Sequence, residues 1–320
     1  MTSARIRQAA IGAGIIFVGA LLVFAAQRID HARLLLALHT VRLPWLLAAL
    51  LCYGAVLPLW ALQWHIIAPA GERNSFSRML GVIAMTSTLY HTSIALVAEA
   101  SSVVLLALRI GISRSAALSV LAMDQLLVGI AKLALLFMAA LMVALPLWMS
   151  NGVVALVLAV SALLTICLAG AWQYEWLLAR LDRILPHRIS AALHAMGVAL
   201  APLRSPYRGG SALGIALVKK LVEIAAIVCV QRSFGVAVPI AEAVLVLAAI
   251  NIFTMIPVVP ANLGVYEGAI VLTYRHFGMA PELALGMAIM QHACFFVALG
   301  LPGFAWFAST GISRRTATAS

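Results

Sequence analysis

A carboxylate placed directly after a broken helix is the residue of this chain best suited to chemistry. Glu267 follows residues 256–264, where Pro257 and Pro260 stop a helix and Asn262 and Gly264 let the backbone turn sharply. Apolar residues flank this stretch on both sides, so we expect the acid to lie inside a membrane. An ionisable group at that depth costs about 2.5–3.5 kcal/mol, which makes it a functional candidate by default.

Two interpretations of Glu267 follow from its spacing. Gly264 stands three residues earlier, which resembles a capping arrangement in which the acid only satisfies the start of a helix. In the functional interpretation the carboxylate contacts a cationic or hydroxylated lipid headgroup, or takes up a proton. Free backbone amides at the same helix start, beside Asn262, would be able to hold a lipid phosphate.

A second acid, Glu99, follows a stretch of similar character. Residues 79–97 are rich in Thr, Ser and His and are too polar for an ordinary lipid-facing helix. A re-entrant hairpin fits them better, because irregular backbone inside a membrane must be buried in protein or line a wet cavity. Glu99 then mirrors Glu267; the alternative is an acid at the membrane interface.

The two acids open similar segments. Glu99 lies twelve residues before Gly111, and Glu267 lies eleven residues before Gly278. The order of features favours an internal duplication over chance similarity in a chain rich in Ala and Leu, and it predicts that both acids lie near one shared cavity. Matching residues recur at equal offsets from the two glycines: Ala117 and Ala284, Leu118 and Leu285, Met123 and Met290, and the polar pairs Asp124-Gln125 and Gln291-His292.

Two arginines and an aspartate are further candidates. Arg109 and Arg275 each precede one of the repeated glycines, and they either pair with the acids or with phosphate, or reach to the interface as long side chains do. Asp124 lies in a long apolar run, and we expect it to face the cavity.

The remaining candidates have equally plain structural interpretations. Lys219 and Glu223 are four residues apart and can pair along one helix face. His91 and His292 would shuttle protons, since histidine titrates near neutral pH, or would be buried and hydrogen-bonded.

The elements that must position these residues are membrane helices. The chain has 320 residues, of which 64% are hydrophobic and 10% charged, and its mean hydropathy is +1.09. A soluble domain carries about 25% charged residues, so the predicted fold class is an all-α polytopic membrane protein. We expect about six full spans and two re-entrant hairpins in an inverted repeat. The net charge of +11 indicates cytoplasmic loops and anionic headgroups, not nucleic acid.

One transmembrane domain is expected over residues 1–320. It divides into N-terminal spans (1–78), a first repeat unit (79–172), a basic loop (173–210) and a last part (211–320) that holds the second unit at 241–310. The basic loop and both termini are predicted to be cytoplasmic, although Arg28, Arg33 and Arg42 would then face outward against the charge rule. Predicted spans are 9–26, 44–67, 116–145, 153–171, 211–230 and 283–307, and residues 185–203 are predicted as a surface amphipathic helix.

At these motifs the sequence resembles the lysylphosphatidylglycerol synthase transmembrane region, also called the flippase-like domain, over about residues 40–310. Pro260-x-x-Leu263-Gly264-Val265-x-Glu267 looks like its proline–glycine–acid signature, and Ala98-Glu99 with Arg109-x-Gly111 is similar to its earlier Gly-Glu motif. Three departures are visible: Ala261-Asn262 replaces a glycine pair, Ala98 replaces the glycine of Gly-Glu, and His292 replaces an arginine of the last long helix.

The resemblance implies that the protein moves a phospholipid or a lipid-linked headgroup between the leaflets of the cytoplasmic membrane. The alternatives are a membrane-embedded transferase on a lipid carrier and a non-catalytic partner in lipid, hopanoid or envelope-glycan synthesis. Expected partners are anionic or isoprenoid-linked lipids, enzymes of lipid or glycan biosynthesis, and a second copy of the chain. Some relatives carry a soluble aminoacyl-transfer domain, which is not expected here.

No enzyme activity, cofactor or metal is expected. The four cysteines form no CxxC pair, and the sequence has no phosphate-cradling loop, zinc spacing or nucleophile elbow. Transport powered by the chain's own ATP hydrolysis is therefore not expected.

Overall fold

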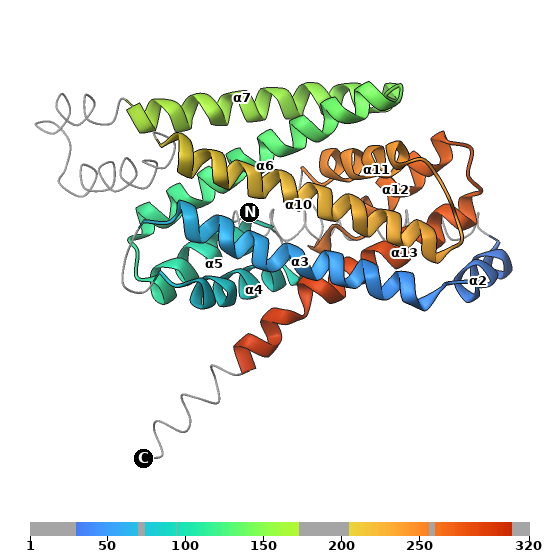
Figure 1. Ribbon diagram of the computed structural model, residues 1–320, viewed down its shortest axis with the longest axis horizontal. Coiled ribbons are helices and arrows are strands. Elements are labelled where there is room, and N and C mark those ends of the chain that lie inside the picture. The colour runs from blue at the N-terminus through green and yellow to red at the C-terminus, as the bar shows by residue number, and fades with distance from the viewer. Residues whose placement is uncertain (1–29, 70–73, 94, 173–204, 256–259, 309–320) are drawn as a thin grey trace, which may run out of the picture.

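The computed structural model describes residues 30–69, 74–93, 95–172, 205–255 and 260–308. Every regular element in these ranges is helical, and the ranges contain no strand (Figure 1). The predicted span at 9–26, the predicted amphipathic helix at 185–203 and Pro257 lie outside the described residues.

The described helices follow one another with short connections. Two π-helical turns, η1 (Leu106–Ile110) and η5 (Phe296–Gly300), extend α5 and α13, while η2 (Leu147–Met149) and η4 (Pro260–Asn262) are single 3₁₀ turns. The α-helices are α2 (His31–His39), α3 (Leu43–Ile67), α4 (Phe76–Thr92), α5 (Ala95–Leu105), α6 (Arg114–Met142), α7 (Ser150–Trp172), α10 (Pro206–Ser233), α11 (Ile240–Phe253), α12 (Val265–His276) and α13 (Pro281–Phe295).

Four segments of the described chain are long and apolar enough to cross a membrane. They are Leu43–Ile67, Arg114–Met142, Leu147–Ile166 and Pro281–Ala308. Helix α10 has 28 residues and is also long enough for a hydrocarbon layer that needs about 20, but Lys219, Lys220 and Glu223 interrupt its apolar character. An all-α integral membrane protein is therefore confirmed, with four clear spans among these residues.

Serine caps fix where several helices begin. The hydroxyls of Ser75, Ser113 and Ser205 each accept a hydrogen bond from the backbone amide three residues later, so one free amide of α4, α6 and α10 is satisfied. Pro206 and Pro281 stand near the start of α10 and α13, where a missing amide hydrogen costs nothing. Local sequence therefore decides these helix starts.

Small residues let α3 and α10 pack closely along their length. The two helices are tied at both ends, since Arg208 donates to the carbonyl oxygen of Ile66 and the amide of Arg42 donates to Ser233. Their fully buried small residues are Ala49, Ala61, Ala212, Ala216 and Ala226.

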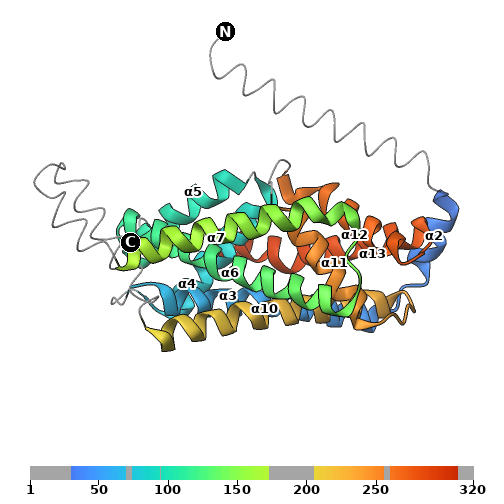
Figure 2. The same ribbon diagram turned by 90° about the horizontal axis from the view of Figure 1, so that it is seen from above.

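Two helical hairpins enter the bundle from opposite ends. Figures 1 and 2 place α4 and α5 toward the end where α7 finishes and α10 begins, and α11 and α12 toward the other end, beside α2. Each hairpin turns back inside the bundle and is followed by a long helix, α6 or α13. The opposite orientation predicted for the two units is thus present in the structure.

The repeat extends to backbone detail. Gly111 and Gly278 both have φ of 79°, a left-handed conformation that glycine adopts without steric cost. The long helix begins three residues after each of them, at Arg114 and at Pro281. The equal offsets seen in the sequence therefore correspond to equivalent turns and helix starts.

Each hairpin has a hydrophobic core of its own. One core joins α11, α12 and α13 to the second half of α10 and to parts of α6 and α7. The other joins α4 to the second half of α3 and the first half of α6. Residues of both cores line a cavity at the inner ends of the hairpins, together with many polar side chains.

Candidate functional site: a charged cavity between two hairpins

A cavity of about 280 Å³ lies where the inner ends of the hairpins meet. Helices α3, α4, α6, α10, α12 and α13 and the turn η4 all contribute to its wall. Five charged residues line it, namely Asp124, Lys132, Lys219, Lys220 and Glu223. Asp124 faces the cavity, as the sequence predicted. The interior of this apolar protein therefore contains a concentrated polar site.

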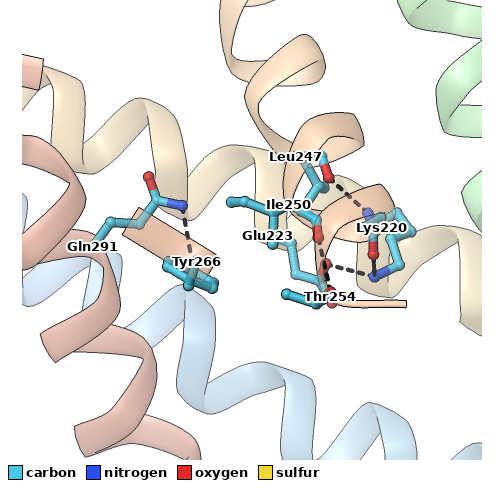
Figure 3. A network of polar contacts seen from close by, with 8 residues as sticks. Lys220, Glu223, Leu247, Ile250, Thr254, Tyr266 and Gln291 are labelled. Carbon is cyan, nitrogen blue, oxygen red and sulfur yellow. Dashed lines mark hydrogen bonds and ion pairs between the residues drawn. The ribbon is translucent and has the colours of Figure 1, made fainter. Parts of the chain in front are cut away.

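One lysine of the cavity is neutralised by the protein. Lys220 Nζ lies 2.7 Å from Glu223 Oε2 and 3.5 Å from Asn251 Oδ1, and Asn251 is itself anchored to the carbonyl oxygen of Leu247 (Figure 3). The predicted pair of Lys219 with Glu223 is therefore wrong. Residues three apart also share a helix face, and here Lys220 takes the carboxylate while Lys219 points elsewhere.

Lys219 and Asp124 are buried without a direct partner of opposite charge. The ammonium of Lys219 lies 5.7 Å from the ring centroid of Trp60, a cation–π distance. Asp124 Oδ1 has no hydrogen-bond partner, and only 4% of the residue is exposed. The two charges interact across the cavity without forming a salt bridge.

Glu267 has two partners in the described chain. Its Oε2 accepts the Gly264 amide at 2.7 Å, and its Oε1 accepts from His292 Nδ1 at 2.6 Å. The predicted capping arrangement is confirmed, with Gly264 at a φ of 81°. The acid is not confined to that role, because its second oxygen holds a side chain of the last long helix.

An aromatic stack connects this pair to the central cavity. Tyr266 stacks on His292, with ring centroids 4.4 Å apart, and its hydroxyl accepts a hydrogen bond from Gln291 at 3.1 Å (Figure 3). Tyr266 lines the central cavity, whereas Glu267 and His292 line a neighbouring cavity of about 440 Å³. The ring of Tyr266 therefore lies between the Glu267–His292 pair and the central cavity.

The two repeated acids line separate cavities, and each of these cavities adjoins the central one. Glu99 lines a third cavity, of about 340 Å³, together with Gln125. That cavity shares Lys132 and Asn262 with the central one, while the cavity of Glu267 shares Ala261 with it. Each acid thus lines a cavity of its own beside the central one.

The flanking cavities are related by the repeat. Gln125 stands fourteen residues after Gly111, as His292 does after Gly278. Each therefore occupies the same position in its long helix, and each shares a cavity with the acid of its own unit. The two units therefore place the same helix position beside their own acids, and in the described chain the second unit carries an acid–histidine pair.

The turn at 261–262 adopts the conformation expected of glycine. Ala261 and Asn262 both have φ of 54°, which is uncommon for residues with a Cβ. Asparagine tolerates this region better than alanine does. The glycine pair of the resembling family suits this backbone, and both residues lie on the wall of the central cavity.

The two arginine candidates lie away from the cavities. Arg275 is exposed in the last turn of α12, and Arg109 is partly buried in η1. Neither forms a salt bridge within the described ranges, so pairing with Glu99 or Glu267 is not observed. Nor do those ranges contain a cluster of three His, Cys, Asp or Glu side chains that would hold a metal ion.

Lys132 and Lys220 are site residues that the sequence did not single out, and Lys219 was a candidate only together with Glu223. All three lysines line the central cavity. A compositional signal was present, because these are the chain's only lysines and the other 18 basic residues are arginines.

Apolar spans, opposed hairpins and a charged interior together define an integral membrane protein with an internal polar site. The chain belongs to the lysylphosphatidylglycerol synthase transmembrane-region family, whose sequence model matches residues 11–303. Searches of curated proteins and of solved structures found no match. The family indicates a membrane protein of lipid synthesis or translocation.

Proposed function

We propose that this protein moves an amphiphilic lipid between the two leaflets of the cytoplasmic membrane. The headgroup passes through the central cavity while the acyl or isoprenoid tails stay in the surrounding lipid. The observation that carries the proposal is the charged cavity at the meeting point of two oppositely oriented hairpins. Transporter sites form in the same way, where broken helices of inverted repeats meet near the midplane.

Two further cavities adjoin the central one and extend the proposed path. The one with Glu99 adjoins the central cavity through Lys132 and Asn262, and the one with Glu267 adjoins it through Ala261. A headgroup leaving the centre toward either side meets an acid of the corresponding repeat unit. Polar groups replace lost hydration along such a path, which lowers the cost of bringing a headgroup through hydrocarbon.

Reconstitution into liposomes with headgroup-labelled lipids tests the proposal. We expect the purified protein to exchange an anionic or isoprenoid-linked lipid between leaflets, measured as label accessible to an impermeant quencher. Val128 lines both the central cavity and the cavity of Glu99, so Val128→Trp should narrow both and slow lipid exchange. The matched control Leu158→Trp adds similar bulk on an exposed face of α7 and should leave exchange unchanged.

Two results would contradict lipid translocation. Absence of exchange for every anionic and isoprenoid lipid offered would exclude it. A labelled lipid recovered with a covalently changed headgroup would instead indicate the membrane-embedded transferase.

A further inference from the structure

The Glu267–His292 pair places two titratable groups together inside the helix bundle. The side chains of Glu267 and His292 are 18% and 6% exposed, and Nδ1 of the histidine donates to the carboxylate at 2.6 Å. The other ring nitrogen of His292, Nε2, makes no hydrogen bond to a described residue, and the residue lines the cavity of Glu267, of about 440 Å³. Nε2 is therefore available to a proton while Nδ1 stays bonded to the acid.

Uptake of one proton changes the charge of this pair from −1 to zero. When His292 is neutral, its Nδ1 donates to an ionised Glu267 and the pair is an anion. A proton taken from cavity water onto Nε2 makes the ring an imidazolium, and the hydrogen bond then joins two opposite charges. Such bonds are about twice as strong as neutral ones. Histidine suits this exchange, because its unperturbed pKa of about 6.5 lies in the physiological range.

The immediate surroundings accommodate both charges of the pair. The ring of Tyr266 stacks on His292 with centroids 4.4 Å apart, and an aromatic face attracts a cation at that distance. The amide of Gly264 donates to the second oxygen of Glu267 at 2.7 Å, which suits a carboxylate. Both neighbours therefore stabilise the imidazolium–carboxylate form.

His91 connects this pair to the central cavity. It lines both the central cavity and the cavity of Glu267, and it is only 8% exposed. Its Nε2 is buried without a hydrogen-bond partner, while its Nδ1 is held by the carbonyl oxygen of Ser87 at 2.7 Å. His91 and His292 interact electrostatically. A second imidazole therefore lies beside the pair with a free nitrogen.

The other titratable groups around the pair come from known positions. Tyr266 belongs to α12 itself, and Tyr53 of α3 lies beside it. The five charged residues of the central cavity lie beyond the ring of Tyr266. Helices α2 and α11, which are described in full, contribute no titratable side chain to the wall of either cavity. Only Glu267, His292 and His91 are titratable among the described residues that line the cavity of Glu267.

We propose that His292 is a proton-binding site that controls lipid exchange. With the proton bound, the pair is neutral, α12 is fastened to α13, and an anionic headgroup passes along the cavity of Glu267. Without the proton, the contact between the two helices weakens and the cavity holds a negative charge that repels the headgroup. This inference rests on the proposed function, whose dependence on protons it specifies.

Lipid exchange measured at several pH values tests the proposal. In phosphatidylcholine liposomes with equal pH on both sides, exchange of fluorescent phosphatidylglycerol should fall at least about tenfold between about pH 5.5 and about pH 8.5. The phosphodiester stays ionised throughout this range, so the change belongs to the protein. His292→Arg carries a permanent charge and should keep nearly one rate at every pH. The matched control His39→Gln, which removes an exposed histidine of α2, should keep the wild-type pH profile.

Nuclear magnetic resonance of protein with ¹⁵N-labelled histidine rings measures the proton directly. The spectrum of His292→Arg, purified in the same detergent, identifies the signals of His292 by their absence. These signals should titrate between about pH 5.5 and about pH 8.5. In Glu267→Gln the midpoint should shift by at least about half a pH unit, because a neutral amide replaces the carboxylate.

A His292 ring that does not titrate across this range would overturn the proposal. A pH profile that persists in His292→Arg and disappears in His91→Gln would assign the proton to His91 and overturn it as well. The proposed function fails separately: titration of His292 that depends on Glu267, without exchange at any pH, would contradict translocation only. Exchange at one rate across the range would contradict proton control only.

Discussion

Glu267 works at the residue scale as both a helix cap and a partner of the last helix. One oxygen holds the Gly264 amide and the other accepts from His292. The cap accounts for the acid at the start of α12. The hydrogen bond to His292 links this acid to α13. The arginine of the resembling family is thus replaced by a residue that still meets the carboxylate.

We expect Glu267→Gln to slow lipid exchange at least about tenfold, because it replaces a charge-assisted hydrogen bond with a neutral one. The amide oxygen can still accept from Gly264, so the thermal midpoint should change little. His292→Arg should keep the contact and most of the rate, while His292→Ala should resemble Glu267→Gln. If Glu267→Gln exchanged lipid in liposomes at the wild-type rate, this acid would have no part in the mechanism.

Ala261 stores conformational strain at the same turn, because its φ of 54° is unfavourable for any residue with a Cβ. Ala261→Gly should raise the free energy of unfolding by up to about 1 kcal/mol, since the strain relieved exceeds the added chain entropy.

The control for this substitution is Ala269→Gly, in the buried interior of α12, which should lower the free energy of unfolding by at least about 0.5–1 kcal/mol. Both changes are read from denaturant unfolding in detergent. Equal destabilisation by the two glycines would show that residue 261 is not strained.

Helix α4 packs closely against the residues that continue α13. Thr88 donates to the carbonyl oxygen of Gly300 at 2.7 Å and accepts from the amide of Gly303 at 3.0 Å. A Cβ added at Gly303 would collide with the Thr88 hydroxyl and with the carbonyl oxygen of Ala84. This contact joins the first hairpin to the last helix across the bundle.

Gly303→Ala should therefore destabilise the protein by about 1–3 kcal/mol, as overpacking does elsewhere. Thermal unfolding in detergent measures it. The control Gly214→Ala places the same methyl group on α10, where a Cβ meets no atom within 4 Å, and should be neutral or stabilising. If Gly303→Ala kept the wild-type thermal unfolding midpoint, α4 and the helix that continues α13 would be shown to move apart at little cost.

The two ends of the helix bundle differ in charge. Arg78, Arg109, Arg114 and Arg208 lie at the helix ends on the side where α4 and α10 begin, and no described acid accompanies them. The opposite end mixes both signs: Asp30, Arg33, Arg42, Arg232, Glu242, Arg275 and Glu282. We infer that the arginine-rich end is cytoplasmic.

Cysteine labelling in intact cells tests this orientation. Ser113→Cys, exposed at the arginine-rich end, should react with an impermeant maleimide only after permeabilisation. His276→Cys, exposed at the other end, should react in intact cells. The unsubstituted protein is the background control; of its four cysteines, Cys52, Cys229 and Cys294 are buried or partly buried. The reversed labelling pattern would invert the assignment.

Most of the helical framework could be predicted locally. The predicted spans at 44–67 and 116–145 correspond to α3 and α6 within three residues, since length and apolar character alone define a span. The second hairpin was predicted from its prolines and glycines, which act through the local backbone, and the first from the polar residues at 79–97. The repeated glycines then turned out to share one φ.

Contacts between elements could not be read from the chain in the same way. Glu267 and His292 are 25 residues apart, and their contact depends on how α12 packs against α13. The choice of Lys220 over Lys219 as the partner of Glu223 depends on neighbours in other helices, such as Asn251 and Trp60. Sequence spacing allowed either pair.

The sequence by itself determined an all-α membrane protein, because hydropathy acts through each local segment, and it predicted two hairpins of similar sequence. Only the tertiary structure decided that the three lysines line one cavity and that the two acids line separate cavities beside it. The physical reason is that a cavity is formed by the side chains of many helices at once. Its charge and shape follow from their packing and not from any single segment.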